Sequence, residues 1–320
     1  MLISVIIPCY NSERTIAETI RSALAQDVER EVIVIDDGST DGSADVISCF
    51  EPDIRVERRQ NGGVSAARNR GGELARGSFL QYVDSDDQLT QGTLRRRRDA
   101  LVSSGADAAY TNWQNLVESA DGSCELGEVV VPPWDDLQED AEAACADSRF
   151  WAPPAAILYR RELVNRIGFW RPNLPVIQDA RFLFDVAAQG GRFVHVPETG
   201  AMYRVRCKSL SRHNHENFMR DCFVNAREIE AHWRVGKNLT PRRVEVLRTM
   251  YRHAAVAALT NGWPEFESAR EFHNAMGRRD FTIESGWFLR RAVGKKTAGA
   301  LARAELRRRA ARRREMPPGS

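Results

Sequence analysis

The first ninety residues repeat one pattern of hydrophobic and polar positions. A short apolar run rich in β-branched residues is followed by a polar turn and then by a segment with apolar residues at helical spacing. The runs predicted as strands are residues 2–7, 32–35, 54–57 and 79–83. This alternation predicts βαβ units, and therefore an α/β fold with a mostly parallel, doubly wound sheet.

The pattern becomes less regular in the middle of the chain. Residues 105–175 contain two proline and tryptophan clusters, Pro132-Pro133-Trp134 and Trp151-Ala152-Pro153-Pro154, which are typical of loops. A helix is expected near Gln178 and a strand at residues 192–196. From about residue 216 the composition is rich in Arg, Ala and Glu, and we expect a helical region.

Composition places the chain among folded globular proteins. Of its 320 residues, 42% are hydrophobic and 28% are charged, which excludes wholesale disorder. No apolar run approaches the roughly 20 residues of a membrane-spanning helix, and the first residues lack the features of a signal peptide. The expected location is therefore cytoplasmic. The six cysteines are scattered without a C-x-x-C pair, so we expect reduced packing residues rather than disulfides or a zinc site.

Charge is distributed unevenly along the chain. The 46 basic and 44 acidic residues nearly balance, but residues 291–314 hold ten basic residues and one acid. Residues 303–314 are helix-prone, with a thin apolar stripe of Ala302, Leu306 and Ala310. Such a basic tail can hold a protein at an anionic inner membrane surface, and it can equally be a disordered solubilising tail.

Polar turns follow three of the predicted strands directly, at residues 8–11, 36–41 and 84–87. In an open parallel sheet the carboxyl ends of the strands share one edge, so we expect these turns to be neighbours. Asp84 and Asp86 alternate on an extended segment and so point the same way, which suits one Mg²⁺ or Mn²⁺ ion. Such an ion neutralises a departing nucleoside diphosphate. Taken alone, the same residues are also typical of a solvated turn with a helix-capping Asp.

Two further segments can contribute to this edge. In the turn at residues 36–42, one carboxylate can bind the base or ribose of a nucleotide, or Asp41 can simply cap a helix. The glycine turn at residues 61–64 can cradle phosphate, although it matches no phosphate-loop consensus. Arg68 follows it, and can pair with a diphosphate or an active-site Asp, or form a surface salt bridge.

Four motifs in this order and spacing resemble the family 2 glycosyltransferases of GT-A fold. They are Ser4-Val5-Ile6-Ile7-Pro8-Cys9-Tyr10-Asn11, Val34-Ile35-Asp36-Asp37-Gly38-Ser39-Thr40-Asp41-Gly42-Ser43, Asn61-Gly62-Gly63 with Ala66-Ala67-Arg68-Asn69, and Tyr82-Val83-Asp84-Ser85-Asp86-Asp87. Three further segments resemble the second half of the family's sequences: Ile167-Gly168-Phe169, Gln178-Asp179, and Tyr203-Arg204 with Ser209-Leu210-Ser211. The resemblance implies a catalytic domain at residues 1–215, followed by a helical extension at 216–290 and the basic tail at 291–320.

The resemblance implies an inverting transfer of a sugar from a nucleoside-diphosphate sugar to a hydroxyl acceptor. The acceptor would be a glycan, or a lipid-linked or cell-surface polysaccharide precursor, and the cofactor Mg²⁺ or Mn²⁺. Carried over by position, the donor-binding residues are Pro8, Tyr10, Asp37, Arg68, Asp84 and Ser85, the metal-binding residues are Asp84, Asp86 and Asp87, and the general base is Asp179. An Asp in the first turn of a helix is expected to stay ionised, and so to be ready to accept the acceptor's proton.

The sequence departs from the family pattern at two positions. Gln178 stands where the family more often has Glu, and Arg206 stands near where many members carry a His. That leaves the nearby histidines as candidates for a metal or phosphate contact, none of which we favour: His195, His213 and His215. Four tryptophans fall where family members build the acceptor site, and we expect core packing for most of them: Trp113, Trp134, Trp151 and Trp170.

Other function classes fit the sequence less well. A sugar nucleotidyltransferase would need a glycine-rich basic loop after the first strand, and residues 8–12 offer none. A nucleic-acid-binding protein is disfavoured because the body is acidic and the basic residues gather at one end. The run Arg95-Arg96-Arg97-Arg98 fans around a predicted helix, so we expect a solvated face. The sequence leaves a homo-oligomer open.

Overall fold

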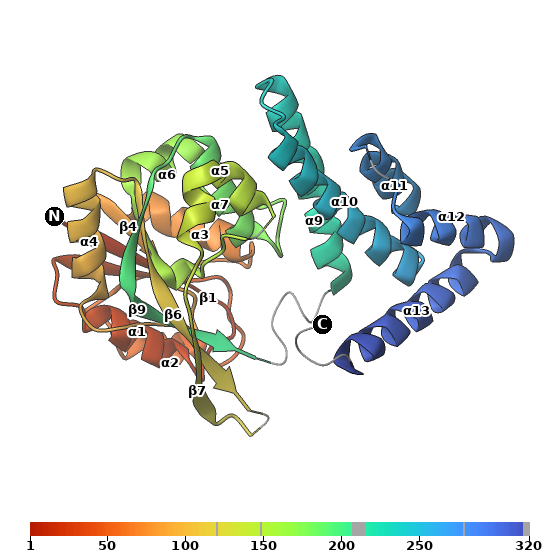
Figure 1. Cartoon of the computed structure of the whole chain (residues 1–320). Coiled ribbons are helices and arrows are strands. Elements are labelled where there is room, and N and C mark those ends of the chain that lie inside the picture. The colour runs from red at the N-terminus through yellow and green to blue at the C-terminus, as the bar shows by residue number, and fades with distance from the viewer. Residues whose placement is uncertain (120, 148, 207–214, 278, 316–320) are drawn as a thin grey trace. The chain divides into compact units, whose positions relative to one another are not determined.

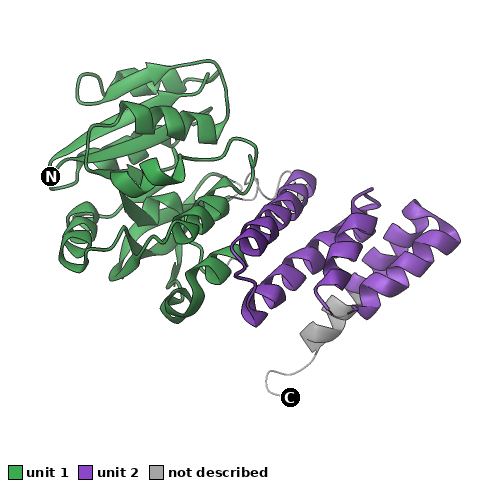
Figure 2. Ribbon diagram, turned by 90° about the horizontal axis from the view of Figure 1, so that it is seen from above, with its two compact units in different colours: residues 1–213 green, residues 214–320 purple. Residues whose placement is uncertain are grey.

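The computed structural model describes residues 1–119, 121–147, 149–206, 215–277 and 279–315, without the side chains of 215 and 308–315. The chain divides into two compact units, residues 1–213 and 214–320 (Figure 2). Within the described residues, no helix has the length and apolar character that crossing a membrane requires.

The first part of unit 1 is a parallel sheet, as predicted. Strand β1 pairs in parallel with β2 and β4, and β2 pairs in parallel with β3. These strands are β1 (Ile3–Cys9), β2 (Arg30–Asp36), β3 (Arg55–Arg58) and β4 (Phe79–Tyr82). Every residue of β1 is buried, as expected for a central parallel strand covered on both faces. All four predicted strands are confirmed within two residues at each end.

Helices cover both faces of this parallel part. Figure 1 shows α1 (Ile16–Leu24) and α2 (Ser43–Ser48) on one side of β1, and α3 (Val64–Leu74) on the other. The small residues of α3 allow it to approach the sheet closely, because a Cβ at Gly71 would collide with the side chain of Ile6. Residues of α3 are therefore brought to the carboxyl edge of the parallel strands.

The rest of the sheet includes antiparallel pairs. The nine strands run in the order β3-β2-β1-β4-β8-β6-β9-β5, with β7 added on β6. Strand β8 is antiparallel to both β4 and β6, whereas β6 and β9 are parallel. The remaining elements of unit 1 are β5 (Gln88–Leu89), α4 (Thr93–Ser104), β6 (Ala108–Glu118), β7 (Cys124–Val130), α5 (Trp134–Ala146), the 3₁₀ helix η1 (Pro154–Ala156), β8 (Ile157–Arg160), α6 (Arg161–Ile167), α7 (Gln178–Ala188) and β9 (Phe193–Val205).

The expectation of a less regular segment at residues 105–175 is wrong. This segment holds β6, β7, α5, β8 and α6. The first four residues of β6 are all buried, and most of the later ones are half-buried, apart from the buried Trp113 and the exposed Val117. No apolar alternation therefore marks the strand in the sequence. Its regularity comes from its neighbours β8 and β9, which pair along both of its edges.

The expectation of a solvated arginine face is wrong for Arg97. Its side chain is completely buried. Nη1 donates to the Gln81 Oε1 (2.7 Å) and to the Ala155 carbonyl (2.8 Å), and Nη2 donates to the Thr111 hydroxyl (2.7 Å). Arg97 thus ties α4 to three separate segments of the sheet region.

Unit 2 is helical, as predicted. It consists of α9 (His215–Val235), α10 (Pro241–Asn261), α11 (Phe266–Ala275), α12 (Phe281–Val293) and α13 (Lys295–Glu315). Apolar residues from successive helices form its core, among them Leu247, Phe266 and Ile283, each with no exposed surface. Most of the basic tail is helix α13, and Ala298 near its start is fully buried.

Candidate active site

The turns after β1 and β2 are joined by hydrogen bonds, as their positions in the sequence predict. The Asn11 Oδ1 accepts from the Thr40 N–H (2.8 Å), and the Asn11 N–H donates to the Ser39 hydroxyl (3.1 Å). The Ser12 N–H donates to the Ser43 hydroxyl (2.7 Å). These contacts hold the two turns side by side at the carboxyl edge of the sheet.

The turn after β4 joins the same group through Ser85. Its hydroxyl lies 2.7 Å from the Ser12 hydroxyl, and its carbonyl accepts from the Thr15 hydroxyl (3.0 Å). Of the other residues predicted to bind the donor here, Tyr10 is 50% exposed and so presents its ring to solvent, whereas Pro8 is buried within β1. Nucleotide contacts by these residues stay predictions.

Asp37 connects the end of β2 to the start of α3. Its side chain is buried and accepts hydrogen bonds from the Gly62 N–H (3.1 Å) and the Gly63 N–H (2.7 Å). The Arg59 Nε lies 3.2 Å from its Oδ1. Gly63 has a φ of 87°, a conformation that favours glycine, which explains the glycine immediately before the helix.

Arg68 connects α3 to the turn after β4. It is 1% exposed, and its Nη2 forms an ion pair with the Asp84 Oδ1. The guanidinium lies 4.2 Å from the centre of the Trp170 ring. The Asn69 side chain fixes the Trp170 backbone by two hydrogen bonds: its Nδ2 donates to the Trp170 carbonyl (2.9 Å), and its Oδ1 accepts from the Trp170 N–H (2.8 Å). Arg68 therefore pairs with a predicted active-site acid and does not form a surface salt bridge. The Nε and Nη1 of Arg68 have no hydrogen-bond partner among the described residues.

In the turn after β4, burial and neighbouring acids raise the pKa of Asp86 and of Asp87. Burial and the charge of Asp84 raise the pKa of Asp86, against the opposing effect of Arg206 and Arg204. Burial and the charges of Asp86 and Asp84 raise the pKa of Asp87 well above its usual range. Arg206 ion-pairs with Asp86 at 3.6 Å. The side chains of Asp84 and Asp86 are each about a third exposed, whereas Asp87 is buried.

Arg204 organises this turn, a role that sequence reasoning missed. Its backbone N–H donates to the Asp87 Oδ1 (2.9 Å), and its Nε donates to the Asp86 carbonyl (3.0 Å). Its Nη2 pairs with Glu18 (2.8 Å) and its Nη1 with Glu118 (3.5 Å). Its place in the Tyr203-Arg204 motif was the available signal, but the motif does not reveal these partners.

Asp179, the predicted general base, lies in the first turn of α7. Its Oδ2 accepts from the Trp151 indole N–H at 2.9 Å, and its Oδ1 accepts from the Ala180 N–H at 2.8 Å. The Trp151 ring packs edge-on against Tyr203 (5.6 Å) and Trp113 (5.7 Å). The tryptophan of the predicted acceptor region thus directly orients the predicted base.

Contacts link Asp179 to the acidic turn: Trp151 binds Asp179 and packs on Tyr203, and the N–H of the next residue, Arg204, binds Asp87. Burial raises the pKa of the Tyr203 phenol, and four carboxylates add to the effect: Asp87, Asp179, Asp84 and Asp86. Asp84 also acts on Asp179 itself. Residues separated by nearly a hundred positions are therefore brought together around Tyr203.

The helix terminus, from which the sequence predicts an ionised Asp179, does not have the largest effect on the pKa of this residue. Burial raises its pKa, and this effect exceeds the lowering by the Ala180 N–H, Arg68 and Trp151. A raised pKa suits a proton acceptor better, because a stronger base takes a hydroxyl proton more readily.

The acids can hold a hard cation only with help from a ligand. Within the described residues, no three His, Cys, Asp or Glu side chains are grouped so as to bind a metal ion. Asp84 and Asp86 are nevertheless partly exposed oxygen donors, and the Asp87 Oδ2 is buried without a hydrogen-bond partner among the described residues. Mg²⁺ needs only one or two carboxylates when phosphates supply further oxygens, so the residues fit such an ion.

The histidine candidates do not join these acids where they are described. The His195 Nε2 lies 2.9 Å from the Asn112 Oδ1, and its ring stacks on Tyr110 (4.8 Å). His213 lies outside the described residues, as do Ser209-Leu210-Ser211 and the side chain of His215. Of the four tryptophans, Trp113 and Trp170 are buried, as expected for core packing, whereas Trp134 and Trp151 are half-buried.

Comparison with known proteins agrees with this geometry. Residues 4–121 match the family model described as glycosyl transferase family 2, over the parallel strands and acidic turns. This part of the chain therefore carries a domain similar to that family, which supports a transferase. The fold is the GT-A-like fold expected from the sequence.

Curated glycosyltransferases match a longer part of the chain. It is 28% identical to glycosyltransferase GlyG of Streptococcus pneumoniae, over 66% of this chain and 73% of that protein. It is 27% identical to TuaG of Bacillus subtilis, a putative teichuronic acid biosynthesis glycosyltransferase, over 72% of this chain and 88% of that protein. Residues 1–349 of S. aureus TarS, in complex with UDP-GlcNAc, have the same fold, with a TM-score of 0.58 and 19% identity, covering 90% of this chain and 91% of that one.

Proposed function

We propose that the enzyme transfers a sugar from a nucleoside-diphosphate sugar to a hydroxyl acceptor with inversion at the anomeric carbon. The observation that carries the proposal is a set of contacts that links Asp179 to the acidic turn: Asp179 accepts from Trp151, Trp151 packs on Tyr203, and the N–H of Arg204, the next residue, donates to Asp87. Asp84 and Asp86, after strand β4, would hold the cation that binds the donor phosphates. Asp179, at the start of a helix, would be the base that takes the acceptor's proton.

The donor half consists of the joined turns. Tyr10 offers an exposed ring for stacking on a base, and Asp37 holds the Gly62–Gly63 backbone from which a nucleotide would be bound. Asp84 and Asp86 would hold a Mg²⁺ or Mn²⁺ ion, with Asp87 beside them. When bound, that ion supplies positive charge to the departing diphosphate. Arg68 has two buried N–H groups without a partner among the described residues, which a phosphate or ribose oxygen would satisfy.

The acceptor half consists of Asp179 and Trp151. Asp179 takes the proton of the acceptor hydroxyl while that oxygen forms a bond to the anomeric carbon. The bond between this carbon and the diphosphate oxygen breaks on the opposite face, and the electron pair leaves with the diphosphate. Trp151 holds the carboxylate by its indole N–H, and so orients it for this step.

The UDP-GlcNAc bound to TarS and the naming of TuaG for teichuronic acid synthesis support a UDP-sugar donor and a cell-surface polysaccharide precursor as acceptor. For such a lipid-linked acceptor, the basic helix α13 would attach the enzyme to the anionic inner surface of the membrane, with the enzyme in the cytoplasm. Leu301 and Leu306 are exposed on this helix beside its arginines. Deleting residues 291–320 should abolish co-sedimentation with anionic vesicles, and unchanged co-sedimentation would rule this attachment out.

A screen of nucleotide-sugars tests the function. We expect one UDP-sugar to raise the melting temperature in the presence of Mn²⁺ and to be hydrolysed slowly when no acceptor is added. Asp86→Asn should remove the metal-dependent part of the stabilisation. If no nucleotide-sugar stabilises the protein, with or without Mn²⁺, the proposal is wrong.

A further inference from the structure

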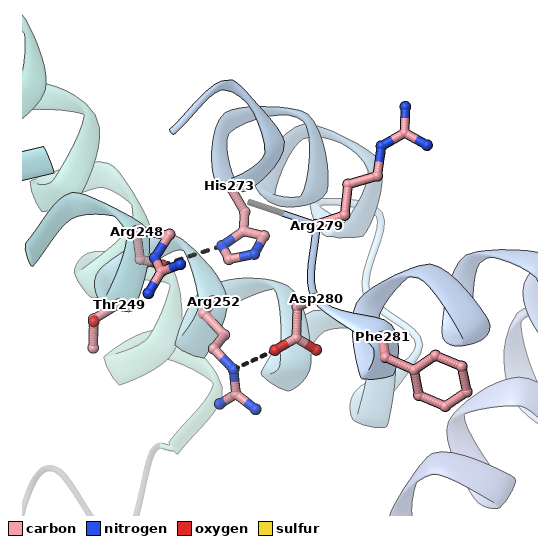
Figure 3. Close-up of a pocket in the computed structure, with 7 residues that line it drawn as sticks. All are labelled: Arg248, Thr249, Arg252, His273, Arg279, Asp280 and Phe281. Carbon is pink, nitrogen blue, oxygen red and sulfur yellow. Dashed lines mark hydrogen bonds and ion pairs between the residues drawn. The ribbon is translucent and has the colours of Figure 1, made fainter. Parts of the chain in front are cut away.

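Unit 2 contains a pocket lined by its own residues. It has a volume of about 400 Å³, within the range of roughly 300–1,000 Å³ typical of small-molecule sites. Its lining comes from α10, α11, the connection before α12 and the first residue of α12: Arg248, Thr249, Arg252, His273, Arg279, Asp280 and Phe281 (Figure 3). Three arginines against one aspartate make the pocket a place for an anion.

One polar atom in this pocket is left unsatisfied. His273 is 2% exposed, and its Nδ1 lies 3.2 Å from the Arg248 carbonyl, to which it donates. The other ring nitrogen, Nε2, is buried without a hydrogen-bond partner among the described residues. Buried ring nitrogens nearly always have a partner, so this atom points to a ligand. Figure 3 shows the ring in the middle of the lining residues.

The Arg252 guanidinium also has N–H groups available for a ligand. The Arg252 Nε donates to the Asp280 Oδ2 at 2.8 Å, which leaves the two terminal nitrogens of its guanidinium for another acceptor. Asp280 is itself occupied, since its other oxygen accepts from the Thr282 N–H (2.8 Å) and the Ile283 N–H (3.2 Å) at the start of α12. Its charge is therefore largely neutralised within the protein and opposes an anion only weakly.

Arg279 stands at the rim without an ion pair among the described residues. Its side chain is exposed and extends outward in Figure 3, so it can fold over a bound group. Arg248 contributes a third guanidinium, which pairs on its outer side with the exposed Glu245. Thr249 adds a hydroxyl to the lining.

We propose that this pocket binds a phosphomonoester. Guanidinium N–H groups and one hydroxyl line the pocket and can donate to anionic phosphate oxygens, whereas Nε2 of the neutral His273 ring can only accept. The monoanion of a phosphomonoester offers both kinds of group, because it has oxygens that accept from the arginines and one P–OH that donates to Nε2. The volume leaves room for the organic part of the ligand. The inference concerns unit 2 alone and does not depend on the donor site of unit 1.

Titration of the full-length chain with glycerol 3-phosphate tests this, with inorganic phosphate and phosphatidic acid vesicles as parallel arms. The readout is the Nε2 resonance of His273 in protein labelled with ¹⁵N-histidine, assigned by the His273→Gln variant. We expect a saturable shift of this resonance, with chloride at the same ionic strength giving none. A response to glycerol 3-phosphate identifies a soluble ligand, and a response confined to the vesicles identifies a lipid headgroup.

Two variants and a control locate the binding. Arg279→Gln changes an exposed residue, so it should leave the melting temperature unchanged and raise the dissociation constant about tenfold, through the loss of one charge-assisted hydrogen bond. Arg252→Gln should do the same if it remains folded. Lys237→Gln removes one positive charge from an exposed position before α10 and should bind like the wild type. No shift of the His273 resonance in any arm, or a shift that neither arginine variant weakens, would overturn the proposal.

Discussion

The indole N–H of Trp151 donates a 2.9 Å hydrogen bond to the Oδ2 of Asp179. The bond stabilises the carboxylate form and lowers the pKa of Asp179, against the stronger effect of burial, which raises it. The same indole packs on Tyr203, whose phenol lies within the influence of all the acids of the turn after β4. Trp151 thus holds the predicted base in position, while burial has the largest effect on the pKa of Asp179.

Asp179→Asn should abolish transfer and spare donor binding. The amide cannot accept the acceptor's proton, and general-base contributions of about 10²–10⁴ in rate would be lost. Turnover and donor affinity, measured separately with the nucleotide-sugar identified by the screen, check this. Asp99→Asn on α4 is the matched control, because Asp99 is exposed. Asp185 on α7 is unsuitable as a control position, since it pairs with Arg171 and Arg181. Full turnover in Asp179→Asn would show that the base lies elsewhere.

As the pH is lowered, kcat/KM should begin to fall at a pH above the usual pKa of an Asp. The pKa of Asp179 is raised in the folded enzyme, and the base must be ionised, so kcat/KM declines as pH falls through this raised pKa. Trp151→Phe keeps an aromatic ring but removes the hydrogen bond that lowers the pKa. The acid limb should therefore move to higher pH by up to about one unit, the equivalent of ~1.4 kcal/mol. Trp113→Phe alters the same aromatic cluster without touching Asp179 and should leave the limb in place.

Arg206→Gln should strengthen metal binding. The Arg206 guanidinium lies 3.6 Å from Asp86 and competes with a cation for that carboxylate. Without it, the Mn²⁺ concentration that gives half-maximal activity should decrease, whereas kcat should fall if Arg206 also contacts the diphosphate. Because the pKa of Asp86 is raised, Mn²⁺ should also bind more weakly as pH falls through that value. An unchanged Mn²⁺ dependence in Arg206→Gln would contradict the competition.

Arg68→Lys should raise the KM for the donor by about tenfold. Lysine keeps the charge but cannot lie flat on Trp170 while its terminal nitrogen reaches Asp84. Arg70→Lys on the same helix is the matched control, since Arg70 is 38% exposed and pairs with Glu57 and Glu73. Equal donor KM values for the two variants would remove Arg68 from the donor site.

Arg204→Gln should destabilise the protein by about 2–3 kcal/mol. The change breaks the pairing of a buried guanidinium with Glu18 and Glu118 and weakens the support of the acidic turn. Arg14→Gln removes an exposed partner of the same Glu118, at 3.9 Å, and should cost less than about 1 kcal/mol. Denaturant unfolding of both variants gives the difference.

The sequence alone determined the parallel part of the sheet and the edge at which the acids lie. The reason is local: βαβ units have short apolar strands with clear periodicity, and each polar turn follows its strand directly, so Asp37 and Asp84 had to reach the same edge. The position of Asp179 at a helix start was also readable, because Gln178 begins an apolar helical pattern.

Only the tertiary structure decided what surrounds those acids. Strand β6 has no alternation of its own and forms because β8 and β9 pair with it, which brings Trp151 to Asp179 and Arg204 to Asp87. Whether an arginine is solvated or buried depends on such distant partners, as Arg97 shows with its bonds to Gln81 and Thr111. The burial that raises the pKa of Asp179 arises from the same packing, since desolvation depends on every segment that covers a group and not on its neighbours in the chain.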